Sequence, residues 1–275
     1  MRDVIIGSIT NYTVKDLRPF VESLNASGFE GDRYLVCYNI DYSTVDYLKK
    51  NGFVLKLFYD VPEQRRFTHI PSKNFHICVD RFFDMWCLLK SLKTDYRYII
   101  STDVGDVIFQ SNPSVWLENN LNDYKINAAT ESVLYKDEIY WGATNMKQSF
   151  GVEVYQTLKD NLIYNAGTIS GKFDTIVDLF LVIYNMCQGF GTRNPDQAAY
   201  NVLLSLEPYK SITKFNMSED GWAAQLGTSM VDKFANVLVE KPPVYENGEI
   251  LTNKTKQPFV IVHQYNRLPH LKLKF

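Results

Sequence analysis

The chain has 275 residues, of which 45% are hydrophobic, enough to bury the core of one large α/β domain or of two small ones. Its formal net charge of −2 gives no electrostatic reason to expect DNA, RNA or an acidic membrane as a partner. The aromatic fraction of 14% suits a cleft that binds sugars or other rings, although aromatic residues are also ordinary core material.

The cysteines and the lengths of the apolar runs indicate the cellular compartment of the protein. Cys37, Cys78, Cys87 and Cys187 form no C-x-x-C pair, so we expect buried thiols in a reducing compartment and no structural zinc site. No apolar run reaches the roughly 20 residues of a membrane span. The amino terminus leads almost directly into an apolar strand pattern, without a basic and apolar leader. These patterns predict a cytoplasmic protein.

The first sixty residues alternate between strand and helix patterns. Short apolar runs predict strands at Val4–Ile9, Tyr34–Tyr38 and Phe53–Phe58. Apolar residues at helical spacing predict helices at Asp16–Leu24 and Tyr42–Lys50. This alternation is typical of parallel strands with right-handed crossovers, an architecture that binds nucleotides. Because neither G-x-G-x-x-G nor a P-loop sequence is present, the usual dinucleotide and Walker modes are excluded.

A polar, basic stretch and a strong helix pattern come next. Val61–Lys73 is predicted to be a loop, whose Arg, His and Lys side chains either close over phosphates or stay solvated. Asn74–Leu92 is predicted to be a helix, because its apolar residues recur at helical spacing. Arg81 lies in a partly apolar row of this helix. That position favours a contact with a diphosphate or with Asp103 over an intrahelical pair with a neighbouring aspartate.

The clearest functional signal lies in Tyr96–Gln110. A buried strand is followed at once by Asp103 and Asp106, with Gly105 between them, and then by a second apolar run, Val107–Phe109. Strand side chains alternate between faces, so two aspartates three apart serve one ion only if the chain turns, and Gly105 would permit a backbone that most residues avoid. Two carboxylates after a central strand predict a divalent-cation site. The alternative is an ordinary turn, in which Asp and Gly are common.

The carboxyl-terminal half has weaker patterns. We predict helices at Pro113–Leu121 and Phe173–Cys187, and strands at Asn127–Ser132, Leu162–Ser170 and Phe259–His263. Tyr135–Met146 has no clear period and is expected to be a loop, in which Trp141 is either a stacking platform for a sugar or a core residue. Asn165-Ala166-Gly167 interrupts its strand, which indicates a bulge or a close approach to the backbone.

Two further positions are candidates for function. Asn194 and Pro195 suit the N-cap and first turn of a helix, which places Asp196 and Gln197 at its amino end. A carboxylate is favoured there, and both side chains would face whatever lies beyond the helix. His263 ends the last apolar strand and is either a structural residue or a metal ligand.

Taken in order, these pieces resemble glycosyltransferases of the GT-A fold, and among them the retaining, glycogenin-like group. The resemblance spans most of the chain: the strand–helix first half, the acidic turn, Asn165–Gly167, Asp196 with Gln197, and the late His263. The family usually carries D-x-D, whereas this chain has the wider D-x-x-D, as the glycosyltransferase domain of lysyl hydroxylase does. The family sequence His-x-x-Gly-x-x-Lys-Pro-Trp is absent, and Arg267 would replace its lysine.

The resemblance implies a single α/β domain over residues 1–275, with a Rossmann-like, mostly parallel central sheet flanked by helices and a mixed carboxyl-terminal half. Residues 1–110 would bind the nucleotide, and residues 111–275 the sugar and the acceptor. The implied reaction transfers a sugar, typically a hexose, from a nucleotide diphosphate sugar such as a UDP-sugar to a hydroxyl of a glycan or protein. Retention would follow from attack on the face of the leaving group, with the diphosphate taking the acceptor proton.

The resemblance also implies roles for individual residues. Asp103, Asp106 and His263 would hold Mn²⁺ or Mg²⁺, which neutralises the departing diphosphate. The other donor-binding roles fall to Arg81 and Arg267 at the diphosphate, Thr10, Asn11 and Tyr12 at the uracil and ribose, and Asn165, Gly167, Asp196 and Gln197 at the sugar. Trp141 would stack on the donor or the acceptor.

Two other classes of protein stay open at this point. A sugar nucleotidyltransferase shares the parallel half and the acidic metal residues, but it normally carries a Gly-rich basic loop that Ile6–Tyr12 does not provide. A non-catalytic carbohydrate-binding protein could keep the fold and the aromatic residues without turnover.

Overall fold

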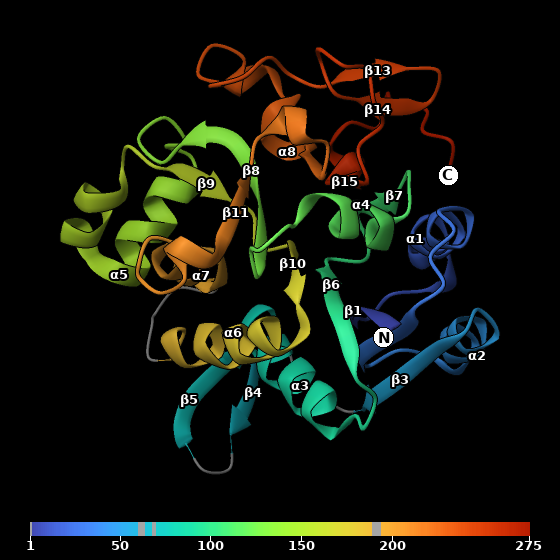
Figure 1. Ribbon diagram of the computed structural model, residues 1–275. Helices are drawn as coiled ribbons and strands as arrows, with labels where there is room; N and C mark the ends of the chain where they lie inside the picture. The colour runs from blue at the N-terminus through green and yellow to red at the C-terminus, as the bar shows by residue number, and fades with distance from the viewer. Residues whose placement is uncertain (1, 60–63, 68–69, 189–193) are drawn as a thin grey trace.

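The computed structural model describes residues 2–59, 64–67, 70–188 and 194–275, with only the backbone described for 64–67 and 70–76. The chain forms a central sheet with helices on both faces and a smaller sheet beside it (Figure 1). The helices are α1 (Val14–Ala26), α2 (Tyr42–Lys50), α3 (Ile77–Ser91), α4 (Pro113–Asn120), α5 (Gly142–Leu158), α6 (Phe173–Met186), α7 (Asp196–Leu204) and α8 (Leu226–Ser229), with short 3-10 helices at η1 (Lys210–Ile212), η2 (Ser218–Asp220), η3 (Asp232–Phe234) and η4 (Tyr265–Arg267).

The strands of the central sheet are β1 (Arg2–Thr10), β2 (Asp32–Tyr38), β3 (Phe53–Phe58), β6 (Tyr96–Thr102), β8 (Ile126–Leu134), β9 (Leu162–Tyr164), β10 (Thr168–Lys172) and β11 (Thr213–Asn216). Their order is β11-β8-β10-β6-β1-β2-β3, with β9 also paired to β8. β1, β2, β3 and β6 are parallel, and β10 runs antiparallel between β6 and β8. The predicted mostly parallel sheet flanked by helices is confirmed.

The order of the strands creates a switch point between β1 and β6. The chain first builds outward from β1 to β3 and then returns to place β6 on the other side of β1. In open α/β sheets, ligands bind in the crevice at the carboxyl ends of the strands where the order reverses. Here β1 ends at Thr10, and Asp103 directly follows the end of β6. The strand order therefore predicts a ligand-binding crevice at the acidic turn.

Strand β6 is buried on both faces, which explains its continuous apolar run. Ile99 belongs to the core cluster that includes residues of α3 and α6, whereas Ile100 belongs to the cluster that includes residues of α1 and α2. Both side chains are 0% exposed. β6 therefore ends in the middle of the molecule, and the residues that follow it start from a fixed position.

Local hydrogen bonds set the starts of several predicted helices. The backbone N–H of Thr13 donates to the Asp16 carboxylate over 2.9 Å before α1, as in a capping box. Before α2, the Asp41 carboxylate accepts from the N–H of Thr44 over 2.7 Å. Asn112 caps α4 by accepting from Ser114 N–H. These caps satisfy N–H groups that have no partner within their own helix.

The smaller sheet is assembled from remote parts of the chain. It consists of β12 (Ala223–Gln225), β15 (Ile261–His263) and β7 (Val107–Phe109), in that order. β15 runs parallel to β12 and antiparallel to β7. Because β7 follows β6 after four residues, the acidic turn is the link between the two sheets. β13 (Val244–Glu246) and β14 (Glu249–Leu251) form an antiparallel hairpin, and Asn247 and Gly248 connect its two strands.

The structure corrects the basic loop and the start of the following helix. Most of Val61–Lys73 belongs to an antiparallel hairpin, β4 (Gln64–Phe67) and β5 (Ile70–His76), and α3 begins at Ile77 instead of Asn74. His69 and the side chains of Arg65, Arg66 and Lys73, expected either to cover phosphates or to stay solvated, lie outside the described part of the structure.

Three smaller predictions are also wrong. The end of Tyr135–Met146 is helical, because α5 starts at Gly142; two glycines, one of them (Gly151) kinking the helix at φ 89°, hid its period. Asn194 is not an N-cap, since Pro195 occupies that position. Cys87 is exposed instead of buried, because it lies on the solvent side of α3. Among the described residues, no helix is both long enough and apolar enough to cross a bilayer.

The burial of β6 yields a test of the fold. Ile100→Ala should lower the free energy of unfolding by about 2–5 kcal/mol, because it leaves a cavity in a fully packed strand. Urea denaturation measures this directly. Val54→Ala, on β3 with 54% of the side chain exposed, is the control and should change stability by about 0.5 kcal/mol or less. Equal effects of the two substitutions would contradict the placement of β6.

Candidate functional site

The turn after β6 holds two carboxylates in place through its backbone. The N–H of Asp103 donates to the carbonyl of Gly167 over 2.8 Å. The carbonyl of Asp106 accepts from the N–H of Gln264, also over 2.8 Å. Each aspartate is therefore tied to a different segment of the carboxyl-terminal half. The turn required for both carboxylates to serve one site is present.

Gly105 serves this turn in a different way from the one predicted. Its backbone lies outside the left-handed region, so conformational freedom does not explain it. A Cβ at this position would lie 2.6 Å from the ring of Tyr12, and the Tyr265 hydroxyl donates to the Gly105 carbonyl over 3.4 Å. Glycine suits this position because the ring of Tyr12 occupies the space that a Cβ would need.

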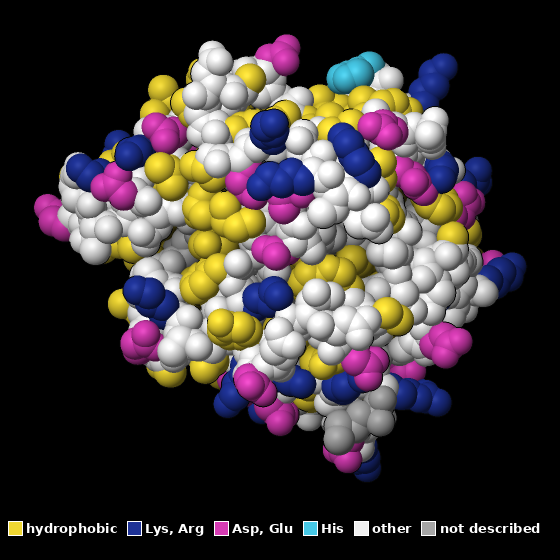
Figure 2. Space-filling view, turned by 45° about the horizontal axis from the view of Figure 1, so that its top comes forward, with side chains coloured by type: hydrophobic (Ala, Val, Ile, Leu, Met, Phe, Trp, Pro, Cys, Tyr) yellow, Lys and Arg dark blue, Asp and Glu magenta, His cyan; other side chains and the backbone are white. Residues whose placement is uncertain are grey.

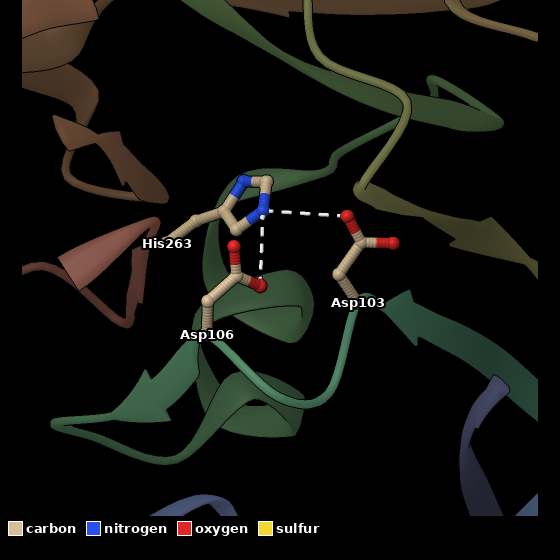
Figure 3. A group of neighbouring side chains, drawn as sticks. All are labelled: Asp103, Asp106 and His263. Atoms are coloured by element: carbon tan, nitrogen blue, oxygen red, sulfur yellow. Dashed lines mark ion pairs between the residues drawn. The ribbon is translucent and has the colours of Figure 1, made fainter. Parts of the chain in front are cut away.

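His263 reaches the two aspartates through the register of the smaller sheet. It pairs with Gln225 on β12 and with Val107 on β7, the residue after Asp106. Figure 3 shows its imidazole pointing at both carboxylates, with Nε2 at 3.4 Å from Asp103 Oδ2 and 3.6 Å from Asp106 Oδ1. One ligand atom from each of the three residues lies within 4.8 Å of the others.

The hydrogen bonds of His263 suit a metal ligand. Gln225 donates through Nε2 to the Thr168 hydroxyl over 2.9 Å, which turns its Oε1 toward His263 Nδ1 at 2.7 Å. Nδ1 therefore donates its proton to Gln225. Nε2 is buried without a hydrogen-bond partner. An oriented imidazole with a free nitrogen beside two carboxylates is a donor set that fits a divalent cation.

The charges of the three groups are strongly coupled. Burial lowers the pKa of His263, but Asp103 and Asp106 outweigh burial and raise it above its ordinary value of 6.5. Burial would raise the pKa of Asp103, yet Arg81 and His263 outweigh it and hold that pKa far below its ordinary value. Burial raises the pKa of Asp106. The carboxylates thus attract a positive charge to Nε2, which a proton or a metal ion can supply.

Arg81 joins this turn to helix α7. Its guanidinium pairs with Asp103 and, over 3.1 Å, with Asp196 at the start of α7. The two carboxylates raise the pKa of Arg81, although burial opposes them. The predicted contact of Arg81 with Asp103 is confirmed. Its contact with Asp196 was not predicted. The pair fixes Asp196 at the amino end of its helix.

Two amides lie beside this network, and a buried carboxylate joins them. Asn165 and Gln197 both donate their NH₂ groups to Glu131 Oε1, over 2.7 Å and 3.0 Å. The Asn165 oxygen accepts from Gly167 N–H over 2.7 Å, and the Gln197 oxygen accepts from Ala166 N–H over 3.3 Å. Burial raises the pKa of Glu131.

Two hollows meet at the three candidate metal ligands. The larger, of about 430 Å³, is lined by Asp103 and His263 together with Arg81, Glu131, Trp141, Asn165, Asp196, Gln197, Lys233, Phe234 and Arg267, among others. The smaller, of about 380 Å³, is lined by Asp106 together with Tyr12, Lys15, Asp16, Pro19, Gly105, Tyr265 and Asn266. The three ligands thus lie between the hollows. On the face shown in Figure 2, acidic and basic side chains meet near the centre, beside exposed hydrophobic ones.

Most of the predicted site residues lie in these hollows. Trp141 is 43% exposed at the rim of the larger one, where its N–H donates to Glu138 over 3.1 Å. Arg267 also lines the larger hollow, with its guanidinium against Gly227. Of the first-strand residues, Tyr12 lines the smaller hollow, but Thr10 and Asn11 line neither.

Several residues of the site were not predicted from the sequence. Glu131 stood out only as the single charged residue within the strand pattern of β8. Glu138 gave no signal, because it works by accepting backbone N–H groups at the start of a helix that was not predicted. Gln225 lies in a segment with no readable pattern. Only its register against His263 shows that it orients the imidazole.

Comparison with known proteins places the fold. The chain matches no protein-family model and no curated protein. Galactosyltransferase LgtC with donor and acceptor sugar analogues (13% identity, TM-score 0.50) and an active-site mutant of LgtC (14%, 0.56) are similar structures, each match covering 94% of this chain and 86% of LgtC. Mouse xyloside xylosyltransferase 1 matches at 13% identity and TM-score 0.52, covering 95% of this chain and 97% of its own. The chain has the GT-A fold of these glycosyltransferases.

The raised pKa of His263 predicts how metal binding depends on pH. Because an ion must displace the proton from Nε2, Mn²⁺ affinity should increase as the pH rises past 6.5, with release of a proton. Calorimetry in two buffers of different ionisation enthalpy measures both effects. His270→Gln, at an exposed histidine, should leave them unchanged. Affinity that does not vary with pH would exclude His263 as a ligand.

The packing around Gly167 gives a second prediction. A Cβ there would lie 2.6 Å from Asp103 Oδ2 and 2.7 Å from His263 Cε1. Gly167→Ala should therefore push two ligands apart and weaken Mn²⁺ binding by about tenfold or more, as overpacking typically costs 1–3 kcal/mol. Mn²⁺ titration of the folded variant measures this loss. Unchanged affinity would mean that the ion binds elsewhere.

Proposed function

We propose that this protein is a metal-dependent glycosyltransferase that transfers a hexose from a nucleotide diphosphate sugar, a UDP-sugar, to a hydroxyl of a glycan or protein. The observation that carries the proposal is the group Asp103, Asp106 and His263, placed between two hollows at the switch point of the sheet. The fold shared with glycosyltransferases supports it. In this proposal residues 1–110 bind most of the nucleotide, and residues 111–275 bind most of the sugar and the acceptor.

The smaller hollow suits the nucleoside. Tyr12 follows the carboxyl end of β1 and presents a ring there, and Lys15 and Asn266 offer polar groups. Thr10 ends β1 and Asn11 follows it, but neither residue lines this hollow. From this hollow a diphosphate would pass beside Asp106 and enter the larger hollow, where the sugar has room.

A divalent ion, Mn²⁺ or Mg²⁺, bound by Asp103, Asp106 and His263 would neutralise the charge that develops on the leaving diphosphate. The chain adds a cation of its own, because Arg267 lines the same hollow and no ion pair with a described carboxylate occupies it. Arg81 acts mainly by holding Asp103 and Asp196 in place. Charge on both sides of the diphosphate stabilises its departure.

The sugar would lie against Asn165, Gly167, Asp196 and Gln197, and the acceptor against Trp141 at the rim. Asp196 is already paired with Arg81, so it is poorly suited to attack the anomeric carbon as a free carboxylate. We therefore propose retention by attack of the acceptor on the face of the leaving group, with a diphosphate oxygen taking the acceptor proton. This mechanism matches the retaining, glycogenin-like group.

The decisive experiment is calorimetry of UDP and a panel of UDP-sugars with and without Mn²⁺. Asp106→Asn should weaken Mn²⁺-dependent UDP binding by about tenfold to 100-fold, because a charged ligand is lost while Arg81 keeps its partners. Asp123→Asn, at an exposed aspartate, is the matched control and should bind like the wild type.

Binding of UDP by the wild type that is indifferent to Mn²⁺ would overturn the metal-dependent function. Turnover distinguishes the other classes. Release of pyrophosphate from NTP and sugar phosphate would identify a nucleotidyltransferase instead. Glycan binding without Mn²⁺-dependent hydrolysis of any UDP-sugar would identify a binding protein.

A further inference from the structure

We infer that Glu131 is a positioning residue for the donor sugar: by accepting hydrogen bonds from Asn165 and Gln197 on one oxygen, it fixes which atoms of these two amides face the sugar. The inference rests on the proposed function, since it concerns the sugar part of the same site. It assigns a role to a residue of β8 that supplies no metal ligand.

The geometry of the network sets both amides in one orientation. Glu131 Oε1 accepts from Asn165 Nδ2 over 2.7 Å and from Gln197 Nε2 over 3.0 Å. The amide oxygens then accept from consecutive backbone N–H groups, those of Gly167 and Ala166. If either amide rotated by 180°, its NH₂ would face a backbone N–H, and its oxygen would face the Glu131 oxygen. Both new contacts are repulsive, so the arrangement has one low-energy form.

This orientation matters because each amide keeps unused capacity. An amide nitrogen has two N–H donors and an amide oxygen has two lone pairs, and the network uses one of each in Asn165 and in Gln197. The remaining donors and lone pairs are available to hydroxyl groups in the larger hollow, which both residues line. A sugar is recognised by the pattern of its hydroxyls, so the direction of these atoms decides which pattern fits.

The backbone of β8 is shaped to bring Glu131 to this place. The register of its pairing with β9 shifts, because Thr130 pairs with Tyr164 and Leu134 pairs with Leu162. Between these two pairs, β8 therefore advances two residues more than β9 does, which is a bulge. Ser132 adopts φ 60°, and its backbone N–H donates to the Thr130 hydroxyl oxygen over 2.9 Å. A bulge re-aims a side chain, and a strained non-glycine residue persists only where its surroundings enforce it.

The position is also buried, at the wall of the larger hollow. The Glu131 side chain belongs to a residue only 6% exposed, and its own carbonyl accepts from the Thr228 hydroxyl over 2.9 Å. Burying a carboxylate destabilises the folded protein unless hydrogen bonds compensate for the loss of its hydration. Here Asn165 and Gln197 supply those hydrogen bonds, so the buried carboxylate and the two amides depend on one another.

The experiment compares two affinities in each variant, those for UDP and for the UDP-sugar that binds the wild type most tightly, both with Mn²⁺. Glu131→Met removes the acceptor and leaves two buried NH₂ groups unpaired, so the preference for UDP-sugar over UDP should fall by about tenfold while UDP affinity stays within about twofold. Glu131→Gln keeps an acceptor oxygen at the same place and should retain most of the preference.

Asn127→Leu is the matched control. Asn127 is a buried polar residue of the same strand, bonded to Ser170 and Asn216 away from the hollow. Its substitution should reduce thermal stability but leave the preference for UDP-sugar unchanged. If Glu131→Met does not fold, Glu131→Asp carries the same test, because its shorter side chain cannot reach both amides.

Three results would overturn the inference: an undiminished preference in Glu131→Met or Glu131→Asp, an equal loss of UDP and UDP-sugar affinity, or a Gln variant as defective as Met. The last result would mean that the negative charge is needed, as expected for a residue in direct contact with the reacting centre. A wild type that binds neither ligand with Mn²⁺ would instead refute the proposed function.

Discussion

The site depends on one constraint: the four residues Asp103 to Asp106 connect the central sheet to the smaller one. β6 ends in the core of the first sheet, and β7 begins at the edge of the second. Because only four residues connect the two sheets, the positions of β6 and β7 fix where both carboxylates lie. The smaller sheet then brings His263 alongside, because β15 pairs with β7. A loss of either sheet would separate the ligands.

The same constraint explains the balance of charge. Asp103, Asp106, Asp196 and Glu131 line or adjoin the two hollows, whereas Arg81 neutralises only Asp103 and Asp196 and the two amides stabilise Glu131. Asp106 is left with His263 as its nearest partner. The surplus of negative charge lies where a cation would complete the site. Such a surplus favours the binding of a cation.

The sequence predicted the elements whose patterns are local. The strand–helix alternation of the first sixty residues and the buried run of β6 are each encoded within short segments, and they appear as expected. Helix α5 was missed because Gly142 and Gly151 weaken its pattern, and the β4–β5 hairpin because its residues are polar. Glu131 and Gln225 act through partners 34 and 38 residues away, and no local pattern records such pairings.

The spacing of the acidic motif follows from this architecture. Two ligands on one strand face the same side when they are two apart, since side chains alternate. Here Asp103 follows the end of one strand and Asp106 precedes the start of another, so alternation does not apply across the turn. An additional residue between the carboxylates is then tolerated, provided that the backbone between them is compact. Tyr12 and Tyr265 pack on Gly105 and enforce that compactness, which makes the wider spacing compatible with a shared ion.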